Sequence, residues 1–306
     1  MNKPNHTHLG LPGLGVALLV NLLFALNVIA MKVVVDATSP LLSVAARMGV
    51  VALVCAPFLR LPPGRVKAIA AYGILNGGLF LLLLNLALHL ATNVGALAIV
   101  GQLSVPFSLL LGALILKERL SARRGFGVVL AFAGVMVLGF DPRIAGELPA
   151  VLVMASAAMM WGGAALIQRR LGGIGVMTIQ AWNGLMGFMM LAPFALLFEH
   201  DRIHRLFHMP PVALSWFIFS SLGSTVVGQG ALAWLLQRYP ISAVMPLMLA
   251  SPVMATAFAA LYFHSPITIG MVAGGSLALA GVAIIAIVRD RPAPEAQALS
   301  KTAANP

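Results

Sequence analysis

The chain has 306 residues, of which 60% are hydrophobic and 9% charged, and its mean hydropathy is +0.99. No soluble domain of this size could bury so much apolar surface, so the composition excludes a soluble globular protein and predicts a polytopic membrane protein. The formal net charge of +11 comes from 19 Lys and Arg against 8 Asp and Glu. Basic cytoplasmic loops account for this excess, and we expect no nucleic-acid partner.

Hydropathy, punctuated by Pro, Gly and short charge clusters, predicts ten membrane-spanning helices. Their approximate bounds are 11–31, 41–60, 67–89, 93–116, 123–140, 148–168, 174–198, 211–235, 240–263 and 267–288. The first apolar run is too long for a signal-peptide core and lacks a convincing cleavage site, so we expect it to be retained. Residues 1–10 and 289–306 are predicted to be cytoplasmic ends, the second of them disordered.

The fourth predicted span carries no charged side chain but contains Gln102 and Pro106. Such residues are tolerated in a membrane where neighbouring helices or a water-filled cavity satisfy the polar groups, so this span should face protein. The ninth span is also interrupted by proline, and Pro252 follows Pro106 by 146 positions. Because proline lacks an N–H and its ring clashes with the preceding turn, we predict hinges at Pro106 and Pro252.

Similar residues recur along the chain at a spacing that grows from 136 to 147 positions. The matches are Phe24-Ala25 with Trp161-Gly162, Lys32 with Arg169, Arg47 with Asn183, Pro57-Phe58 with Pro193-Phe194, Pro106 with Pro252, and Gly134 with Gly281. The sequence thus predicts an all-α membrane protein built from two five-helix repeats, residues 11–140 and 148–288. Because five is odd, the repeats are inverted, which places a substrate site near mid-membrane between them.

Basic residues predict the orientation. With a cytoplasmic N-terminus, 14 of the 19 Lys and Arg residues fall in cytoplasmic segments and four in outer ones, while Arg47 lies within the second span. Both termini and the connection at 117–124 should therefore be cytoplasmic. The segment at 200–211, which lengthens the second repeat, should be outside.

Polar side chains within the spans are candidates for a substrate site. Asn85 shares a helical face with Gly78, and Gln102 shares one with Pro106. Gln229 is a further polar residue within a span, and helix packing requires none of these three amides. The glycines on these faces are equally compatible with close helix packing. Arg47 either attracts a substrate carboxylate, or extends outward or bonds to backbone carbonyls.

Aromatic and sulfur-containing side chains could form the apolar wall of such a site. Trp161 and Trp234 offer aromatic surfaces, and Met245 and Met248 adapt to side chains of different shape. For Trp161 a role as a membrane-interface anchor is an equal alternative. The predicted substrate-binding residues are Arg47, Gly78, Asn85, Gln102, Trp161, Gln229, Trp234, Met245 and Met248.

We expect no cofactor and no metal. His200, His204 and His208 recur every four residues, as metal ligands on one helix face would, but neither a cysteine nor an apolar shell supports such a site. None of the eight Asp and Glu residues lies in a span centre. We therefore expect neither a catalytic carboxylate pair nor a carboxylate that carries protons through the membrane.

Several motifs carry a family resemblance: Trp161-Gly162 early in the second repeat, and Lys117-Glu118-Arg119-Leu120-Ser121 followed by Gly125, Gly127 and Gly134. With the doubled five-span unit, they resemble EamA-type transporters of the drug/metabolite transporter superfamily, most of all the bacterial aromatic amino acid exporters. The resemblance implies a non-enzymatic exporter of small metabolites in the bacterial inner membrane. Phe24-Ala25 stands where Trp-Gly is common, and His264-Ser265 where an acidic residue often follows the fourth helix.

These observations favour an exporter of amino acids, including aromatic ones, that works by alternating access as a monomer in the lipid bilayer. A carrier of sugar phosphates or nucleotide-sugars is the alternative among transporters, although phosphate recognition normally recruits more Arg and Lys than the spans contain. An intramembrane enzyme is the alternative of another class.

Overall fold

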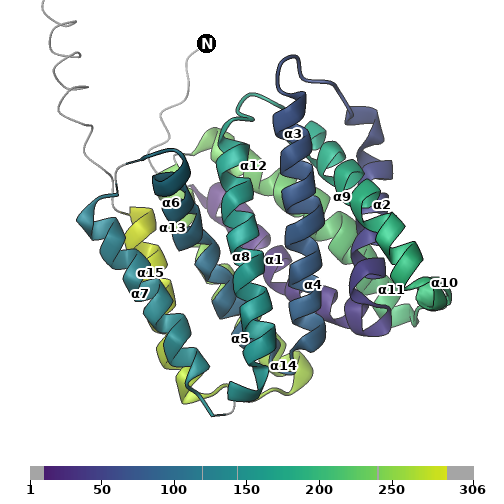
Figure 1. Ribbon diagram of the computed structural model, residues 1–306. Coiled ribbons are helices and arrows are strands. Elements are labelled where there is room, and N and C mark those ends of the chain that lie inside the picture. The colour runs from purple at the N-terminus through teal and green to yellow at the C-terminus, as the bar shows by residue number, and fades with distance from the viewer. Residues whose placement is uncertain (1–9, 119, 143, 240, 288–306) are drawn as a thin grey trace, which may run out of the picture.

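The protein is a bundle of helices (Figure 1), seen in a computed structural model that describes residues 10–118, 120–142, 144–239 and 241–287. Ten helical stretches are long and apolar enough to cross a membrane, which confirms the predicted all-α fold with ten spans. The predicted ends at 1–10 and 289–306 lie outside the described residues, apart from Gly10.

The first unit begins with α1 (Leu11–Ala37) and α2 (Pro40–Cys55), which the turn η1 (Ala56–Phe58) extends. Its third span consists of α3 (Val66–Tyr72), η2 (Gly73–Phe80) and α4 (Leu81–Leu90). Its fourth consists of α5 (Val94–Val100), η3 (Gly101–Leu103) and α6 (Ser104–Ile115), and its fifth is α7 (Ala122–Gly139). The second unit begins with α8 (Leu148–Arg169) and α9 (Val176–Phe198). Its third span consists of α11 (Pro211–Ile218), η6 (Phe219–Gly228) and α12 (Gln229–Arg238). Its fourth consists of α13 (Ile241–Met248) and α14 (Ala250–Phe263), and its fifth is α15 (Ile269–Ile287). The connections contain η4 (Ala145–Glu147), η5 (His200–Arg202) and α10 (Ile203–Phe207).

The two units share irregularities that mark them as repeats. In each, the third span contains a π-helical segment, η2 or η6, followed by an α-helix of ten residues. Lys117 and His264, 147 positions apart, follow the fourth span of their units with positive φ angles of 54° and 52°. Pro106 and Pro252 each stand third in a helix that resumes after a break, at η3 or at Leu249.

Glycine permits the closest helix contacts. A Cβ atom added to Gly134 of α7 would lie 2.4 Å from the Ala278 backbone nitrogen of α15, and one on Gly281 would lie 2.5 Å from the Ala131 nitrogen. Such backbone approach is the usual basis of helix association in lipid, where the hydrophobic effect between helices is absent. Gly134 and Gly281, which the sequence repeat pairs with each other, therefore allow α7 and α15 to pack closely.

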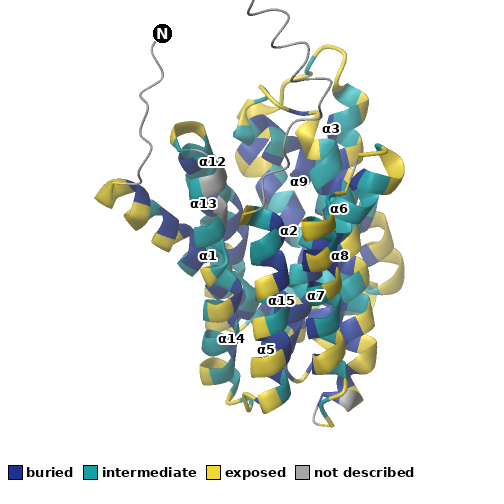
Figure 2. Ribbon diagram, turned by 90° about the vertical axis from the view of Figure 1, so that its left-hand side faces the viewer, coloured by how far each residue is buried: buried dark blue, intermediate teal, exposed yellow. Residues whose placement is uncertain are grey.

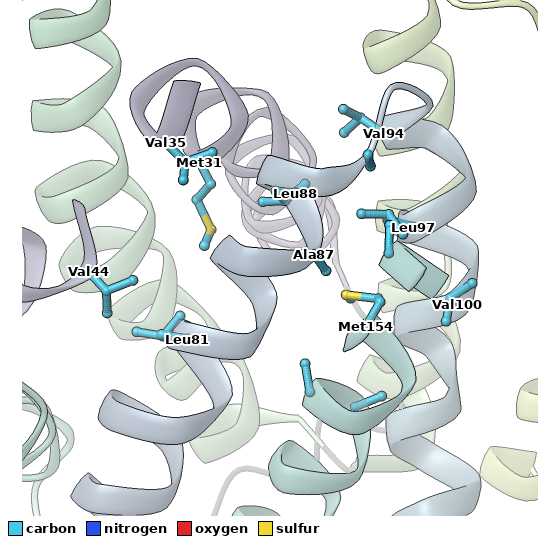
Figure 3. Close-up of a cluster of buried hydrophobic side chains, with 14 of the residues drawn as sticks. Met31, Val35, Val44, Leu81, Ala87, Leu88, Val94, Leu97, Val100 and Met154 are labelled. Carbon is cyan, nitrogen blue, oxygen red and sulfur yellow. The ribbon is translucent and has the colours of Figure 1, made fainter. Parts of the chain in front are cut away.

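The apolar core is distributed unevenly along the bundle axis. We call the end that carries Arg60, Arg65, Lys117, Arg169 and Arg238 the basic end, and the other the opposite end. A large cluster joins both units through the middle and the opposite end; Figure 3 shows its members Met31, Val35, Val44, Leu81, Ala87, Leu88, Val94, Leu97, Val100 and Met154.

At the basic end the core is divided. One cluster unites α3, α8 and α9 around Ile69 and Trp182, and another unites α1, α12 and α13 around Val20, Leu235 and Val244, with no residue in common. In Figure 2, α12 and α13 stand apart from α3 at this end. The start of α12 nevertheless approaches the start of α9, since a Cβ added to Gly230 would lie 3.7 Å from the Met177 methyl carbon. The buried apolar core is thus continuous through the middle of the bundle and includes two separate smaller clusters at the basic end.

Candidate functional site

A small polar cavity lies below the joined opposite end, between α1, α2, α4, α11 and η6. Its lining residues are Met31, Val34, Ser43, Arg47, Asn85, Phe217 and Ser220. Its volume of about 10 Å³ is enough for roughly one water molecule. Arg47 stands seven residues after Pro40, so the cavity lies about 10 Å from the opposite end along α2.

Arg47 is the charged group of this cavity and has only 8% of its surface exposed. Its Nη2 donates a hydrogen bond to Thr225 Oγ1 of η6 over 2.7 Å, whereas Nε and Nη1 have no partner among the described residues. The guanidinium neither extends outward nor bonds to backbone carbonyls. An unpaired buried charge is expensive, and the residues that line the cavity include no carboxylate, so the cavity has unused capacity for an anionic group.

Neutral polar side chains surround this guanidinium. Ser43 Oγ donates to Asn85 Oδ1 over 3.3 Å, and Ser220 Oγ donates to Asn27 Oδ1 over 2.8 Å. On the Thr225 side, Gln180 Nε2 donates to the Thr225 carbonyl over 3.2 Å. The site thus combines one cation with amide and hydroxyl groups from five spans, of both units.

A neutral counterpart of the Arg47 bond lies between the same kinds of spans. Arg47 and Thr225 join the second span of the first unit to the third span of the second unit. Asn183 of α9 accepts a hydrogen bond from Asn76 of η2 over 3.0 Å, which joins the second span of the second unit to the third span of the first. Arg47 and Asn183 are matched by the sequence repeat, so the two bonds are related by the pseudo-symmetry and only one carries a charge.

Arg47 and Asn85 are the predicted residues that the structure brings together in this cavity. Gly78 is buried against α9, where an added Cβ would lie 2.5 Å from Met190 Sδ, so its environment is that of a packing glycine. Gln102 lies half-buried in η3, and Gln229 lies half-buried at the start of α12. These two amides are not part of the cavity lining.

Trp161 occupies an inward face of α8. The exposed residues Leu152, Ser156 and Met159 follow one face of this helix, while Trp161 follows buried Met154 and Ala158 on the other at helical spacing. Trp161 nevertheless has 44% of its surface exposed, and it stacks on Phe80 of η2 with ring centroids 5.3 Å apart. Its exposed surface therefore lies on the side of α8 that carries the buried residues.

The other predicted apolar residues lie at the basic end. Trp234 and Met248 pack against the α1–α12–α13 cluster. The Arg238 guanidinium lies 4.3 Å from the centre of the Trp234 ring, a cation–π contact that occupies one face of the indole. Met245 belongs to α13, but its side chain lies outside the described residues.

Sequence-based prediction did not single out Ser43, Ser220 and Thr225, which contact Arg47 or line its cavity. It also missed Asn27 and Gln180, which bond to Ser220 and Thr225. Ser220 and Thr225 lie in the π-helical segment η6, where the Thr225 hydroxyl bonds to the Ser220 carbonyl five residues back. In a π-helical segment, a period of 3.6 residues per turn places side chains on the wrong face of the helix. Polar residues inside predicted spans were the available signal, and they required no assumption about helical phase.

The described carboxylates lie near helix ends. Glu199 accepts hydrogen bonds from Ser39 Oγ and the Leu42 backbone N–H at the start of α2. Glu147 accepts one from the Asn93 N–H, 2.8 Å away, at the start of α5. Both positions place negative charge where free N–H groups and the helix dipole favour it. Among the described residues, no group of three or more His, Cys, Asp or Glu side chains could hold a metal ion.

The fold and the buried polar site define a polytopic membrane transporter rather than an enzyme. The model of the EamA-like transporter family matches residues 11–140 and 148–287, and the chain belongs to this family.

Relatives in bacteria are distant but span nearly the whole chain. The "Probable amino-acid metabolite efflux pump" of Escherichia coli (strain K12) is 26% identical over 277 residues, covering 88% of this chain and 92% of that protein. The protein of the same name from Salmonella typhimurium (strain LT2) is 27% identical over 278 residues, with the same coverage. A solved crystal structure with 20% identity aligns over 90% of this chain and 97% of its own, with a TM-score of 0.59, and shows the same fold.

Proposed function

We propose that this transporter exports amino acids, including aromatic ones, across the bacterial inner membrane by alternating access. The observation that carries the proposal is the buried Arg47 guanidinium, which has unused donors on Nε and Nη1 and no carboxylate in its cavity. The distant likeness to proteins named as amino-acid metabolite efflux pumps supports the same substrate class.

The chemistry of the cavity suits a zwitterion with an apolar side chain. A substrate carboxylate would bind Arg47 through charge-assisted hydrogen bonds. The Asn85 amide oxygen and the Ser43 and Ser220 hydroxyl oxygens, which line the cavity, can accept from the ammonium group. This group needs no full negative counter-charge when several dipoles solvate it. Met31, Val34 and Phe217 then provide apolar surface for the side chain.

Transport requires a larger opening than the present cavity. A space for roughly one water cannot hold an amino acid, so binding must move helices that now contact one another. The two separate apolar clusters at the basic end and the exposed Trp161 ring support a route from the cytoplasm, with both termini proposed to lie on that side. The breaks before Pro106 and Pro252 are the proposed hinges.

Reconstituted liposomes provide the experiment. Liposomes loaded with unlabelled phenylalanine should accumulate labelled phenylalanine by exchange, and apolar and aromatic amino acids should compete better than sugar phosphates. Arg47→Gln should abolish the exchange, whereas Arg123→Gln, which removes an exposed positive charge, should not. Competition by a sugar phosphate at concentrations where phenylalanine has no effect would favour a phosphosugar carrier instead.

A further inference from the structure

Phe217 of α11 lines two separate hollows. One is the polar cavity of Arg47. The other is a groove of about 360 Å³ along the outward side of α2, opposite α10 and α11. The groove is lined by apolar residues that include Ala46, Val50, Leu53, Phe207, Leu214 and Phe217. The Phe217 side chain is thus the shared wall between a buried cation and an apolar groove.

The positions on α2 explain how the two hollows adjoin. Ser43 and Arg47 line the polar cavity, whereas Ala46, Val50 and Leu53 line the groove from the neighbouring face of the same helix. The groove opens outward, since Leu53 is 76% exposed. Phe217 is half-buried and is the residue that both linings share.

We propose that Phe217 is a lateral gate, and that the two hollows form one site for amphiphilic amino acids with a long unbranched side chain. The polar part of this site is the amino-acid site of the proposed function, on which the inference therefore rests. Arg47 would hold the carboxylate, and the side chain of the substrate would continue past Phe217 into the groove. Two observations select this occupant: the unpartnered donors of Arg47 require an anionic head, and the adjoining groove is apolar along its length.

The length of the groove limits the length of the substrate side chain that it can cover. Ala46 and Leu53 are seven residues apart, or about 10 Å along α2. An extended chain advances about 1.2 Å per bond, as in an extended peptide, so the groove covers roughly eight bonds. Burying a methylene group completely lowers a dissociation constant about fourfold, and a groove open on one side should give about twofold.

Equilibrium dialysis in lipid nanodiscs of fixed composition tests the gate without requiring transport. The probes are radiolabelled 2-aminohexanoate, 2-aminooctanoate, 2-aminodecanoate and phenylalanine. For Phe217→Ala and the milder Phe217→Leu, we expect the dissociation constant to fall about twofold or more per added methylene. The wild type should show a smaller dependence on length over this series, because a probe long enough to pass Phe217 must also meet the cost of opening the gate, which the shortest probe avoids. Two folding-competent variants that show no steeper dependence than wild type would overturn the proposal.

A matched pair of variants separates the groove from the bilayer. Leu53→Trp fills the groove, and Leu197→Trp places the same ring on a comparably exposed position of α9 that does not line it. In the Phe217→Ala background, Leu53→Trp should remove the gain with length and Leu197→Trp should preserve it. A gain with length that survives Leu53→Trp would mean that the probes partition into lipid, and it would overturn the proposal. The proposal would also be overturned if Leu53→Trp weakened the binding of every probe by the same factor, the result expected for a groove occupied by a lipid chain.

The same measurements distinguish failure of the proposed function. If neither phenylalanine nor 2-aminohexanoate shows saturable binding that depends on Arg47, the amino-acid site itself is wrong. If both bind through Arg47 but chain length has no effect in any variant, the amino-acid site stands and only the lateral gate is refuted.

Discussion

Arg47 Nη2 lies 2.7 Å from Thr225 Oγ1, and this bond joins the second span of one inverted repeat to the third span of the other. The pseudo-symmetric position carries Asn183, bonded to Asn76. The two symmetry-related positions therefore differ in charge, since one holds a buried guanidinium and the other a neutral amide. For the proposed amino-acid substrate, Arg47 is the group that would distinguish the carboxylate from the ammonium end.

Thr225→Val should destabilise the protein, because it removes the hydrogen bond that the described structure gives the Arg47 guanidinium. A hydrogen bond to a charged group contributes about 1.5 to 3 kcal/mol, and a buried guanidinium without a partner adds a penalty. Unfolding in mixed micelles should show a loss of this size for Thr225→Val and recovery for Thr225→Ser. Equal stability of Thr225→Val and wild type would mean that water already satisfies Arg47.

Glu118 and Arg169 should make stability depend on acidic pH. Arg169 donates to both Glu118 oxygens, at 2.8 and 3.2 Å. These hydrogen bonds hold the pKa of the Glu118 carboxyl below its ordinary value of 4.5. A group with a depressed folded pKa stabilises the fold above its unfolded pKa, and this contribution is lost as the pH falls through the folded pKa.

Glu118→Gln should therefore be less stable than wild type at pH 7, by at most about 1 kcal/mol because the pair is exposed. The difference should persist near pH 4.5 and vanish at more acidic pH. Unfolding midpoints measured across this range provide the check. A difference that stays constant down to strongly acidic pH would assign the effect to packing rather than to charge.

Transport should not be driven by a proton gradient through a carboxylate. The described Asp and Glu residues lie at or near helix ends and in connections, and Glu147 and Glu199 are engaged with helix N-termini. Movement is then either facilitated or coupled through His89 or another group, so reconstituted Glu118→Gln should respond to an imposed pH difference as the wild type does. Uphill accumulation that disappears in Glu118→Gln, while binding remains, would contradict this expectation.

The orientation can be tested by labelling single cysteines. Cys55 is buried and is the only cysteine, so Cys55→Ala gives a background without thiols. A cysteine at position 204 in α10 should react with an impermeant reagent added outside, and one at position 117 only with a reagent on the cytoplasmic side. The reverse pattern would invert the proposed topology.

The sequence was sufficient for the fold because its signals do not depend on fine geometry. Long apolar runs require helices in lipid, and matched residues such as Pro106 and Pro252 locate corresponding breaks. Arg47 and Asn85 were predicted because polar groups inside spans need partners, and the two residues line one cavity. Thr225 and Ser220 were missed because η6 is π-helical, which shifts the helical phase, and Gly78 was assigned to a cavity although its face meets Met190.

Carboxylate recognition by Arg47 is tested most directly by comparing phenylalanine with phenethylamine, which lacks only the carboxylate. Equilibrium dialysis should show that Arg47→Gln weakens phenylalanine binding about ten- to hundredfold, the equivalent of one charged hydrogen-bonding group, and leaves phenethylamine binding nearly unchanged. Arg123→Gln should change neither. Unaltered phenylalanine binding in a folded Arg47→Gln protein would contradict the account, and so would equal weakening of both ligands.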